Sequence, residues 1–160
     1  MSGSKIISLS KLKTKIRSLK LKNQRIVFTN GCFDILHYGH VKYLEDAKKI
    51  GDYLVVAINS DSSIKKIKAK NRPVVKEADR QRVVAALGCV DFVVLFNEDN
   101  PLKVIQALKP DILIKGSDWK KHKIIGAEFV QSYGGKVLTL KLVKGRSTSA
   151  LIAKIVHDFS

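Results

Sequence analysis

The chain has 160 residues, of which 45% are hydrophobic and 28% charged, and its formal net charge is +16. This length suits one domain with a single core, and this composition is typical of a folded globular protein rather than a disordered one. No apolar run approaches the ~20 residues that span a bilayer, and no signal peptide is evident. Cys32 and Cys89 form no CxxC pair, so neither a disulfide framework nor a four-cysteine metal site is expected. We expect a cytoplasmic protein.

The positive charge is concentrated in segments. Residues 1–24 carry seven basic and no acidic side chains, and further lysines and arginines gather in 65–76 and 120–123. Such clusters suit a polyphosphate substrate as well as a nucleic acid, and a solvated lysine-rich surface is the simpler alternative.

In chain order, residues 1–24 are expected to form one basic helix, capped by Ser8 or Ser10. Short β-branched runs then alternate with helical stretches. Strands are expected at 26–28, 53–58, 92–96, 111–115 and 136–142. Helices are expected at 39–50, after 61, at 77–87, 101–108 and 126–133, and from 147. Nearly continuous apolar strands separated by helices predict a doubly wound α/β fold with a parallel five-stranded sheet. We divide the chain into a helical extension, 1–24, and one domain, 25–160, whose ligands bind beyond the carboxyl ends of the strands.

Two histidines follow the first strand, three residues apart. Gly31 permits a tight turn whose backbone N–H groups form a cradle for phosphate oxygens. Gly39 allows close approach where the next helix begins, and the free N–H groups of that helix favour an anion. His37 and His40 are then placed to hydrogen-bond a phosphate as its charge rises. Zinc is the alternative for paired histidines, but no third ligand lies at a familiar spacing.

A second phosphate-binding pattern opens the last predicted helix. Gly145-Arg146-Ser147-Thr148-Ser149 supplies hydroxyls, free N–H groups and a forked cationic donor to the β- and γ-phosphates. Plain capping by Ser147 is the alternative, and both use the same geometry.

The pattern His37-Tyr38-Gly39-His40 after a strand and a Gly-Cys-Phe-Asp turn resembles the HxGH signature of the cytidylyltransferase-like nucleotidyltransferases. Class I aminoacyl-tRNA synthetases share a related motif, but they carry a KMSKS-type loop that this sequence lacks. The resemblance covers Arg25 to about Ile155 and is greatest to the heptose 1-phosphate adenylyltransferases. Its matching segments are 28–37, 59–61, 72–74, 77–80, 90–91, 109–111 and 115–119.

Two positions depart from the family pattern. Residues 115–119 read Lys-Gly-Ser-Asp-Trp in place of Lys-Gly-Gly-Asp-Tyr. Leu142 stands where glycerol-phosphate cytidylyltransferases have an arginine, which favours the heptose branch.

The resemblance implies a Rossmann-like nucleotidyltransferase fold and transfer of AMP from ATP, with Mg²⁺, to the sugar 1-phosphate D-glycero-β-D-manno-heptose 1-phosphate. The products are ADP-heptose, a lipopolysaccharide core precursor, and pyrophosphate. It also implies a homodimer and a separate heptose kinase. Within the fold, the alternatives are a glycerol 3-phosphate cytidylyltransferase and an FMN adenylyltransferase. A basic nucleic-acid-binding module is the alternative of another class, although no nucleic-acid-binding motif is found.

By this resemblance, the catalytic residues are His37, His40 and Lys68, with Lys66 and Lys70 as competitors for the lysine role. The nucleotide-binding residues follow three strand ends and are Asn30, Gly31, Cys32, Phe33, Gly39, Lys115, Gly116, Asp118, Arg146, Ser147, Thr148 and Ser149. The acceptor-binding residues are Asp34, Asn59, Asp61 and Arg80. A surface ion pair of Arg80 with Glu77 is the alternative for that arginine. We expect no metal site made of protein side chains.

Overall fold

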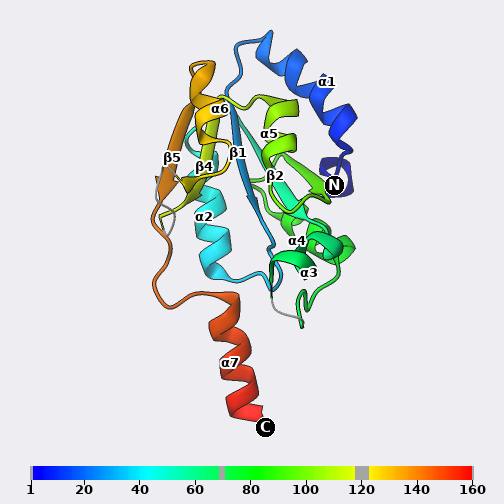
Figure 1. The fold of residues 1–160 in the computed structure, drawn as a ribbon, viewed down its shortest axis with the longest axis vertical. Helices are drawn as coiled ribbons and strands as arrows, with labels where there is room; N and C mark the ends of the chain where they lie inside the picture. Colours follow the sequence, from blue (N-terminus) through cyan, green and yellow to red (C-terminus); the bar gives the residue numbers. More distant parts are fainter. Residues whose placement is uncertain (1, 69–70, 118–122, 160) are drawn as a thin grey trace.

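A computed structural model describes residues 2–68, 71–117 and 123–159. Five strands alternate with helices (Figure 1). The strands are β1 (Ile26–Gly31), β2 (Tyr53–Asn59), β3 (Phe92–Phe96), β4 (Ile112–Gly116) and β5 (Lys136–Leu140). The helices are a 3₁₀ turn η1 (Ser2–Lys5), α1 (Leu9–Lys20), α2 (Tyr38–Lys48), α3 (Asp61–Ile67), α4 (Glu77–Ala86), α5 (Leu102–Leu108), α6 (Ala127–Ser132) and α7 (Thr148–Phe159). The predicted elements are confirmed, with ends that differ by a few residues.

The five strands form one parallel sheet in the order β3-β2-β1-β4-β5. In the centre of the sheet Phe28 of β1 pairs with Val55 of β2 on one side and with Leu113 of β4 on the other. The chain winds outward through β2 and β3 and then returns to the other side of β1 with β4. This order confirms the doubly wound fold and puts the topological switch point between β1 and β4, where such folds bind ligands.

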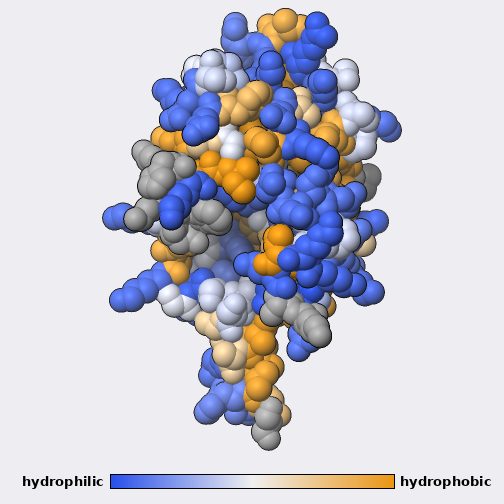
Figure 2. Space-filling model, in the orientation of Figure 1, coloured by the Kyte–Doolittle hydropathy of each residue, from blue (hydrophilic) through white to orange (hydrophobic). Residues whose placement is uncertain are grey.

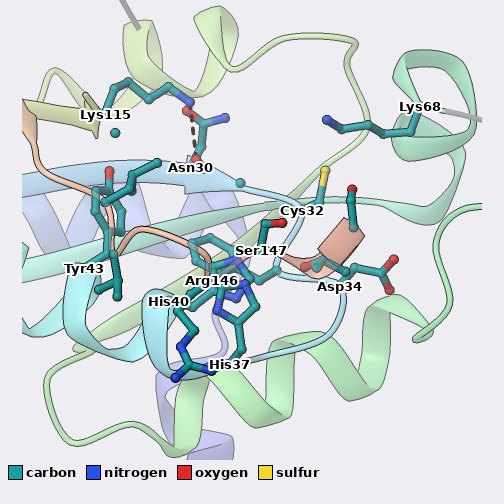
Figure 3. A pocket seen from close by; sticks show the side chains of 18 of the residues that line it. Asn30, Cys32, Asp34, His37, His40, Tyr43, Lys68, Lys115, Arg146 and Ser147 are labelled. Carbon is teal, nitrogen blue, oxygen red and sulfur yellow. Dashed lines mark hydrogen bonds between the residues drawn. The ribbon is translucent and has the colours of Figure 1, made fainter. Parts of the chain in front are cut away.

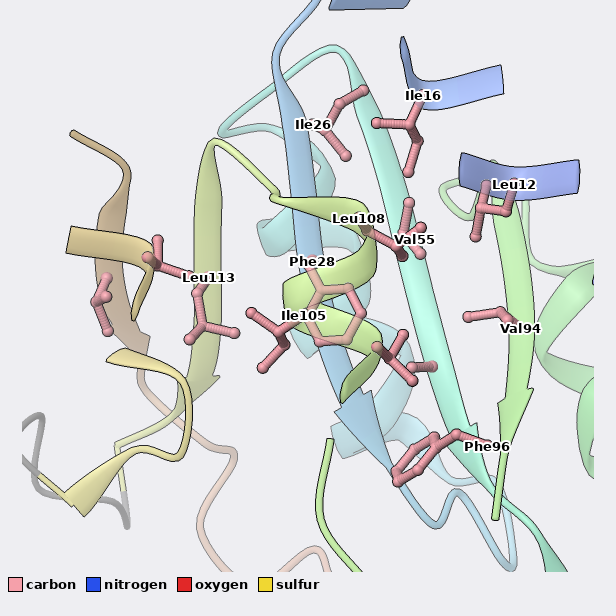
Figure 4. Packing of buried hydrophobic residues seen from close by; sticks show 14 of the residues in the cluster. Leu12, Ile16, Ile26, Phe28, Val55, Val94, Phe96, Ile105, Leu108 and Leu113 are labelled. Carbon is pink, nitrogen blue, oxygen red and sulfur yellow. The ribbon is translucent and has the colours of Figure 1, made fainter. Parts of the chain in front are cut away.

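Helices cover both faces of the sheet. On one face α1, α5 and α6 pack over a cluster that includes Phe28, Ile105 and Leu113 (Figure 4). On the other face α2 and α4 bury Leu44 and Val84 against the sheet. Because every central strand is covered on both sides, its side chains are apolar almost without interruption, which explains the continuous runs in the sequence.

The N-terminal helix is packed against this body. Leu12, Ile16 and Leu19 of α1 are buried, at a spacing that places them on one face of the helix, while its lysines and its arginine face outward or lie at the margin. Ahead of the helix, the Ile7 N–H donates to the Val93 carbonyl at 3.0 Å. The first residues thus cover the outer edge of β3, which is otherwise open to pairing with another chain.

Acidic side chains gather at the amino end of the sheet, away from the switch-point edge. Asp91, just before β3, accepts a hydrogen bond from the Leu54 N–H at 2.6 Å. Asp111, just before β4, accepts one from the Ile26 N–H at 2.8 Å. Asp52 accepts one from the N–H of Arg25, the residue that precedes β1, at 2.7 Å. These carboxylates complete the backbone hydrogen bonding where neighbouring strands begin.

The last helix, α7, extends from the body (Figure 1) and buries none of its residues. Ile155, Val156 and Phe159 are exposed on it, and hydrophobic side chains are visible along it in Figure 2. Within the described residues, no helix has both the length and the apolar character to cross a bilayer.

Candidate active site

A cavity of about 380 Å³ opens at the carboxyl end of the sheet. Its walls come from the end of β1, the start of α2, the end of β4 and the segment before α7, which are far apart in the sequence. Every predicted nucleotide-binding or catalytic residue in the described part of the chain lies on these walls. Asp118 lies outside the described residues. The switch point of the sheet therefore gathers the predicted motifs at one site.

The two histidines lie face to face at the start of α2. Their ring centroids are 3.9 Å apart and their planes are inclined by 25°. His37 is the residue before the first helical turn, and His40 lies within that turn, where its N–H donates to the His37 carbonyl at 2.9 Å. The Nδ1 atoms of both rings are buried and have no hydrogen-bond partner among the residues that the structure describes. Two imidazoles with unused polar atoms thus line the cavity, as predicted (Figure 3).

Both histidines are neutral at pH 7. Burial, and then the charge of neighbouring His37, lowers the pKa of His40 to about 4. Burial and the nearby Arg146 guanidinium lower the pKa of His37 below its usual 6.5. A neutral imidazole carries one ring N–H, so each histidine offers one hydrogen-bond donor to an anion without the cost of a buried charge.

The start of α7 lies beside the histidine pair. The Ala150 N–H donates to the Ser147 hydroxyl at 3.1 Å, which is the geometry of an N-cap. Thr148 donates to the Ile35 carbonyl at 3.4 Å and so ties α7 to the loop after β1. A Cβ atom added to Gly39 would lie 3.0 Å from the His37 ring and 3.1 Å from the Arg146 Cβ. Glycine at this position therefore lets the two helix starts approach closely without displacing His37 or Arg146. The N–H groups and dipoles of these helix starts favour a polyphosphate.

The loop after β1 forms the floor of the cavity. A Cβ atom added to Gly31 would lie 3.0 Å from the ring of Phe33, which itself has a left-handed backbone with φ of 46°. Lys115 Nζ donates to the Asn30 carbonyl at 3.3 Å. The Asn30 Oδ1 atom is buried and has no hydrogen-bond partner in the described part of the chain. Burial raises the pKa of the Cys32 thiol despite nearby cations, so this cysteine is a protonated, unreactive part of the wall.

Among the lysines of the basic loop, Lys68 lies on the cavity wall. Lys66 pairs instead with Asp99 at 3.3 Å, with both side chains largely exposed, and Lys70 lies outside the described residues. The structure thus favours Lys68 over Lys66 for the predicted catalytic lysine.

Asp34 is buried and acts as a clamp on the loop before α4. Its carboxylate accepts hydrogen bonds from the Val74 N–H at 2.9 Å and the Val75 N–H at 2.8 Å. Arg72 Nε lies 2.6 Å from Asp34 Oδ2. The two groups are not aligned for a hydrogen bond, so the contact is an ion pair. With its oxygens engaged in this way, Asp34 holds the loop over the cavity.

Arg80, a predicted acceptor-binding residue, is only 1% exposed and lies beneath the cavity. Its guanidinium donates to the carbonyls of Val75, Cys32 and Asn59 and pairs with Asp61 at 2.8 Å. Neither Arg80 nor Asp61 is on the cavity wall. The alternative of a surface ion pair with Glu77 is wrong, because the Arg80 side chain points inward, where two loop carbonyls and the carbonyl at the end of β2 accept its hydrogen bonds.

The structure also adds wall residues to which the sequence analysis assigned no binding role. Tyr43, Arg72, Leu142 and Val143 line the same cavity. Tyr43 lies one turn after His40 and shares a hydrogen bond with Thr29 at 2.8 Å. Its helical spacing from His40 is the one signal that pointed to it, because the others come from loops without regular periodicity.

The chain resembles several known proteins over most of its length. It is 49% identical over 154 residues to the bifunctional protein HldE of Geotalea uraniireducens, covering 96% of this chain and 31% of that protein. The chain therefore spans about a third of the length of the curated relatives it matches.

Two solved structures extend the comparison. The lipopolysaccharide core biosynthesis protein of Thermoplasma volcanium is 33% identical, with a TM-score of 0.61, and the match covers 76% of this chain and 98% of that one. A pantoate-beta-alanine ligase of Francisella tularensis has a TM-score of 0.62 at 16% identity, covering 95% of this chain and 78% of that one. At that identity the second likeness concerns the fold alone.

The family model described as cytidylyltransferase-like matches residues 28–153. That range begins in β1, takes in both histidines and ends within α7, so it contains the two helix starts that meet at the cavity. The chain belongs to the cytidylyltransferase-like family.

Proposed function

We propose that the protein transfers AMP from ATP to D-glycero-β-D-manno-heptose 1-phosphate, giving ADP-heptose and pyrophosphate for lipopolysaccharide core synthesis. The likeness to HldE proteins and to a lipopolysaccharide core biosynthesis protein supports this choice of acceptor. The observation that carries the proposal is the meeting of His37, His40 and the start of α7 at one cavity. Neutral ring donors, a guanidinium and a helix start together suit a triphosphate chain.

The chemistry is an in-line displacement at the α-phosphorus. An oxygen of the acceptor phosphate forms a bond to that phosphorus, the bond from it to the β-phosphate oxygen breaks, and pyrophosphate leaves. The acceptor oxygen is already anionic at pH 7, so no general base has to remove a proton. Positioning and stabilisation of the developing charge then supply the catalysis.

Each group on the wall has a role in this reaction. His37 and His40 donate ring N–H groups to the phosphate oxygens as negative charge moves onto the leaving group. Arg146 and the N–H groups of α7 hold the outer phosphates. Lys68 stabilises the α-phosphate, and its flexible stem lets its charge follow the reaction.

Magnesium enters with the nucleotide. Within the described ranges, no group of three histidine, cysteine, aspartate or glutamate side chains is placed to hold a metal ion. Among the described wall residues the one carboxylate is Asp34, which is engaged by Arg72 and two backbone N–H groups. Mg²⁺ commonly binds through substrate phosphates and water, so we treat MgATP as the substrate and assign no residue to the ion.

Pyrophosphate release tests the proposal. The purified protein is incubated with MgATP or MgCTP and, in turn, with D-glycero-β-D-manno-heptose 1-phosphate, glycerol 3-phosphate and FMN. We expect release only with ATP and the heptose phosphate. Release with CTP and glycerol 3-phosphate, or with ATP and FMN, would identify the other family activities. Salt-sensitive DNA binding with no nucleotide turnover would instead support a nucleic-acid-binding protein.

A further inference from the structure

A second cavity of about 270 Å³ adjoins the first across the end of β1. The two share the loop from Asn30 to Cys32 and the side chains of Lys68 and Lys115. The rest of the second wall comes from the end of β2, the loop between β3 and α5, and a residue before α6. Its members are Asn59, Ile67, Asp99, Asn100, Pro101 and Ile125. The histidines and the start of α7 lie on the wall of the first cavity, so the two spaces differ in chemistry.

The boundary between the cavities is positively charged. Lys68 and Lys115 extend from opposite sides toward the space above Asn30 and Cys32 (Figure 3). At the same place Asn30 has a buried Oδ1 that is unpaired among the described residues; this oxygen is an acceptor and suits a ligand hydroxyl rather than a phosphate. An anion in either cavity gains from these two ammonium groups, so the boundary is where two phosphates are brought together at the lowest electrostatic cost.

The wall of the second cavity that Asp99 contributes carries a negatively charged side chain instead. The Asp99 carboxylate pairs with Lys66 at 3.3 Å, and 61% of each side chain is exposed, so the pair exchanges readily with solvent or a ligand. A carboxylate repels a phosphate but accepts hydrogen bonds from hydroxyl groups. A ligand with a phosphate at one end and hydroxyls at the other is therefore oriented by the two walls, with its phosphate at the lysines. Ile67 and Ile125 supply apolar surface for its carbon skeleton.

We propose that the second cavity holds the acceptor, with its phosphate between Lys68 and Lys115 and its hydroxyl groups on Asp99, which thereby determines acceptor specificity. This inference rests on the proposed function. In the resulting arrangement an acceptor phosphate oxygen faces the α-phosphorus across the loop of Asn30 to Cys32. The bond between them forms as pyrophosphate departs on the histidine side.

Asp99→Ala tests the specificity role, and Glu98→Gln is the matched control, because Glu98 is the neighbouring acid and lies off both cavity walls. Steady-state rates are measured with MgATP and D-glycero-β-D-manno-heptose 1-phosphate, each varied in turn. A hydrogen bond to a charged group is worth about 1.5–3 kcal/mol, so Asp99→Ala should raise the KM of the sugar phosphate about 10- to 100-fold. The KM of ATP should stay within about twofold of the parent value, as should both constants of Glu98→Gln.

Ile125→Trp, which fills the second cavity, gives a readout that is independent of turnover. Calorimetry measures binding of the heptose phosphate to enzyme saturated with α,β-methylene-ATP. We expect this variant to lose heptose phosphate binding while it retains stabilisation by the ATP analogue. If the parent turns over the heptose phosphate but both variants keep its parent affinity, the inference is wrong and the proposed function stands. If the parent turns over no sugar phosphate, the proposed function fails and the inference with it.

Discussion

Asp34→Asn should destabilise the protein by about 3 kcal/mol, because it removes a buried charge that several groups share. The carboxylate is 1% exposed and its partner Arg72 is 19% exposed. The asparagine amide keeps one oxygen that can accept from the Val74 and Val75 N–H groups. Its NH₂ group replaces the other oxygen and, being a donor, cannot pair with the Arg72 guanidinium. Losing one partner of a buried ion pair costs about 3–5 kcal/mol, and the partial exposure of the arginine places the estimate at the low end. For a domain of this size the melting temperature should fall by about 6–12 °C.

The assay is urea unfolding followed by circular dichroism at pH 7, with thermal unfolding as a second measurement. Asp46→Asn is the control, because Asp46 pairs with lysines on the outer surface of α2; we expect little change in its midpoint. A double-mutant cycle of Asp34→Asn with Arg72→Gln should give a coupling energy of about 1–2 kcal/mol. A loss below about 1 kcal/mol for Asp34→Asn would refute the assignment of this carboxylate as a clamp.

The same substitution should also reduce activity. Val75, held by Asp34, accepts a hydrogen bond from Arg80 Nε at 2.9 Å, and Arg80 donates to the Cys32 carbonyl in the loop below the cavity. A displacement of the Val75 backbone is therefore transmitted through the Arg80 side chain to the phosphate-binding loop that contains Cys32. We expect kcat/KM to fall about tenfold or more, since small displacements at a reaction centre are costly. Activity equal to the parent under conditions where the variant is folded would contradict this coupling.

Three further outcomes are expected. His40→Ala should lower kcat about 10²- to 10³-fold, the usual cost of one donor to a developing charge. The pKa of His40 is about 4 in the folded protein and near 6.5 in the unfolded chain. Between these pH values the unfolded chain binds more protons, so the free energy of unfolding should fall as the pH drops from 6.5 to 4. The expected loss is about 2 kcal/mol after allowing for partial exposure of the ring. Gly39→Ala should raise the KM of ATP about tenfold, because the added methyl group displaces His37 and Arg146 by a few tenths of an ångström. The free energy of unfolding should not fall, because alanine favours the helix.

Each of these has a control. His157→Ala changes a histidine that is exposed on α7 and should leave kcat unchanged; a His40→Ala enzyme within tenfold of the parent would contradict the role of the pair. For the pH effect, urea midpoints of the parent and His40→Ala are compared from pH 4 to 8, and parallel curves would show that His40 is not responsible. For Gly39→Ala, equal kinetic constants would mean that the two helix starts are not held together as described.

The sequence by itself determined the local structure and the place of the phosphate-binding patterns. Continuous β-branched runs such as 53–58 predicted buried parallel strands, because a strand covered on both faces has no polar side. The glycines and histidines of 31–40 predicted a phosphate-binding turn, because that chemistry depends on a few neighbouring residues. These predictions rest on interactions between residues close in the chain, and the observed elements match them.

The tertiary structure decided what depends on distant partners. Arg80 reads as an exposed helix residue, and only the carbonyls from two loops and from the end of β2 make it a buried crosslink. Asp34 and Arg72 lie far apart in the sequence, and Asp99 joins Lys68 at the second cavity because β3 is placed beside β2. Strand order and the burial of charge are set by packing of the whole chain, which no local pattern encodes.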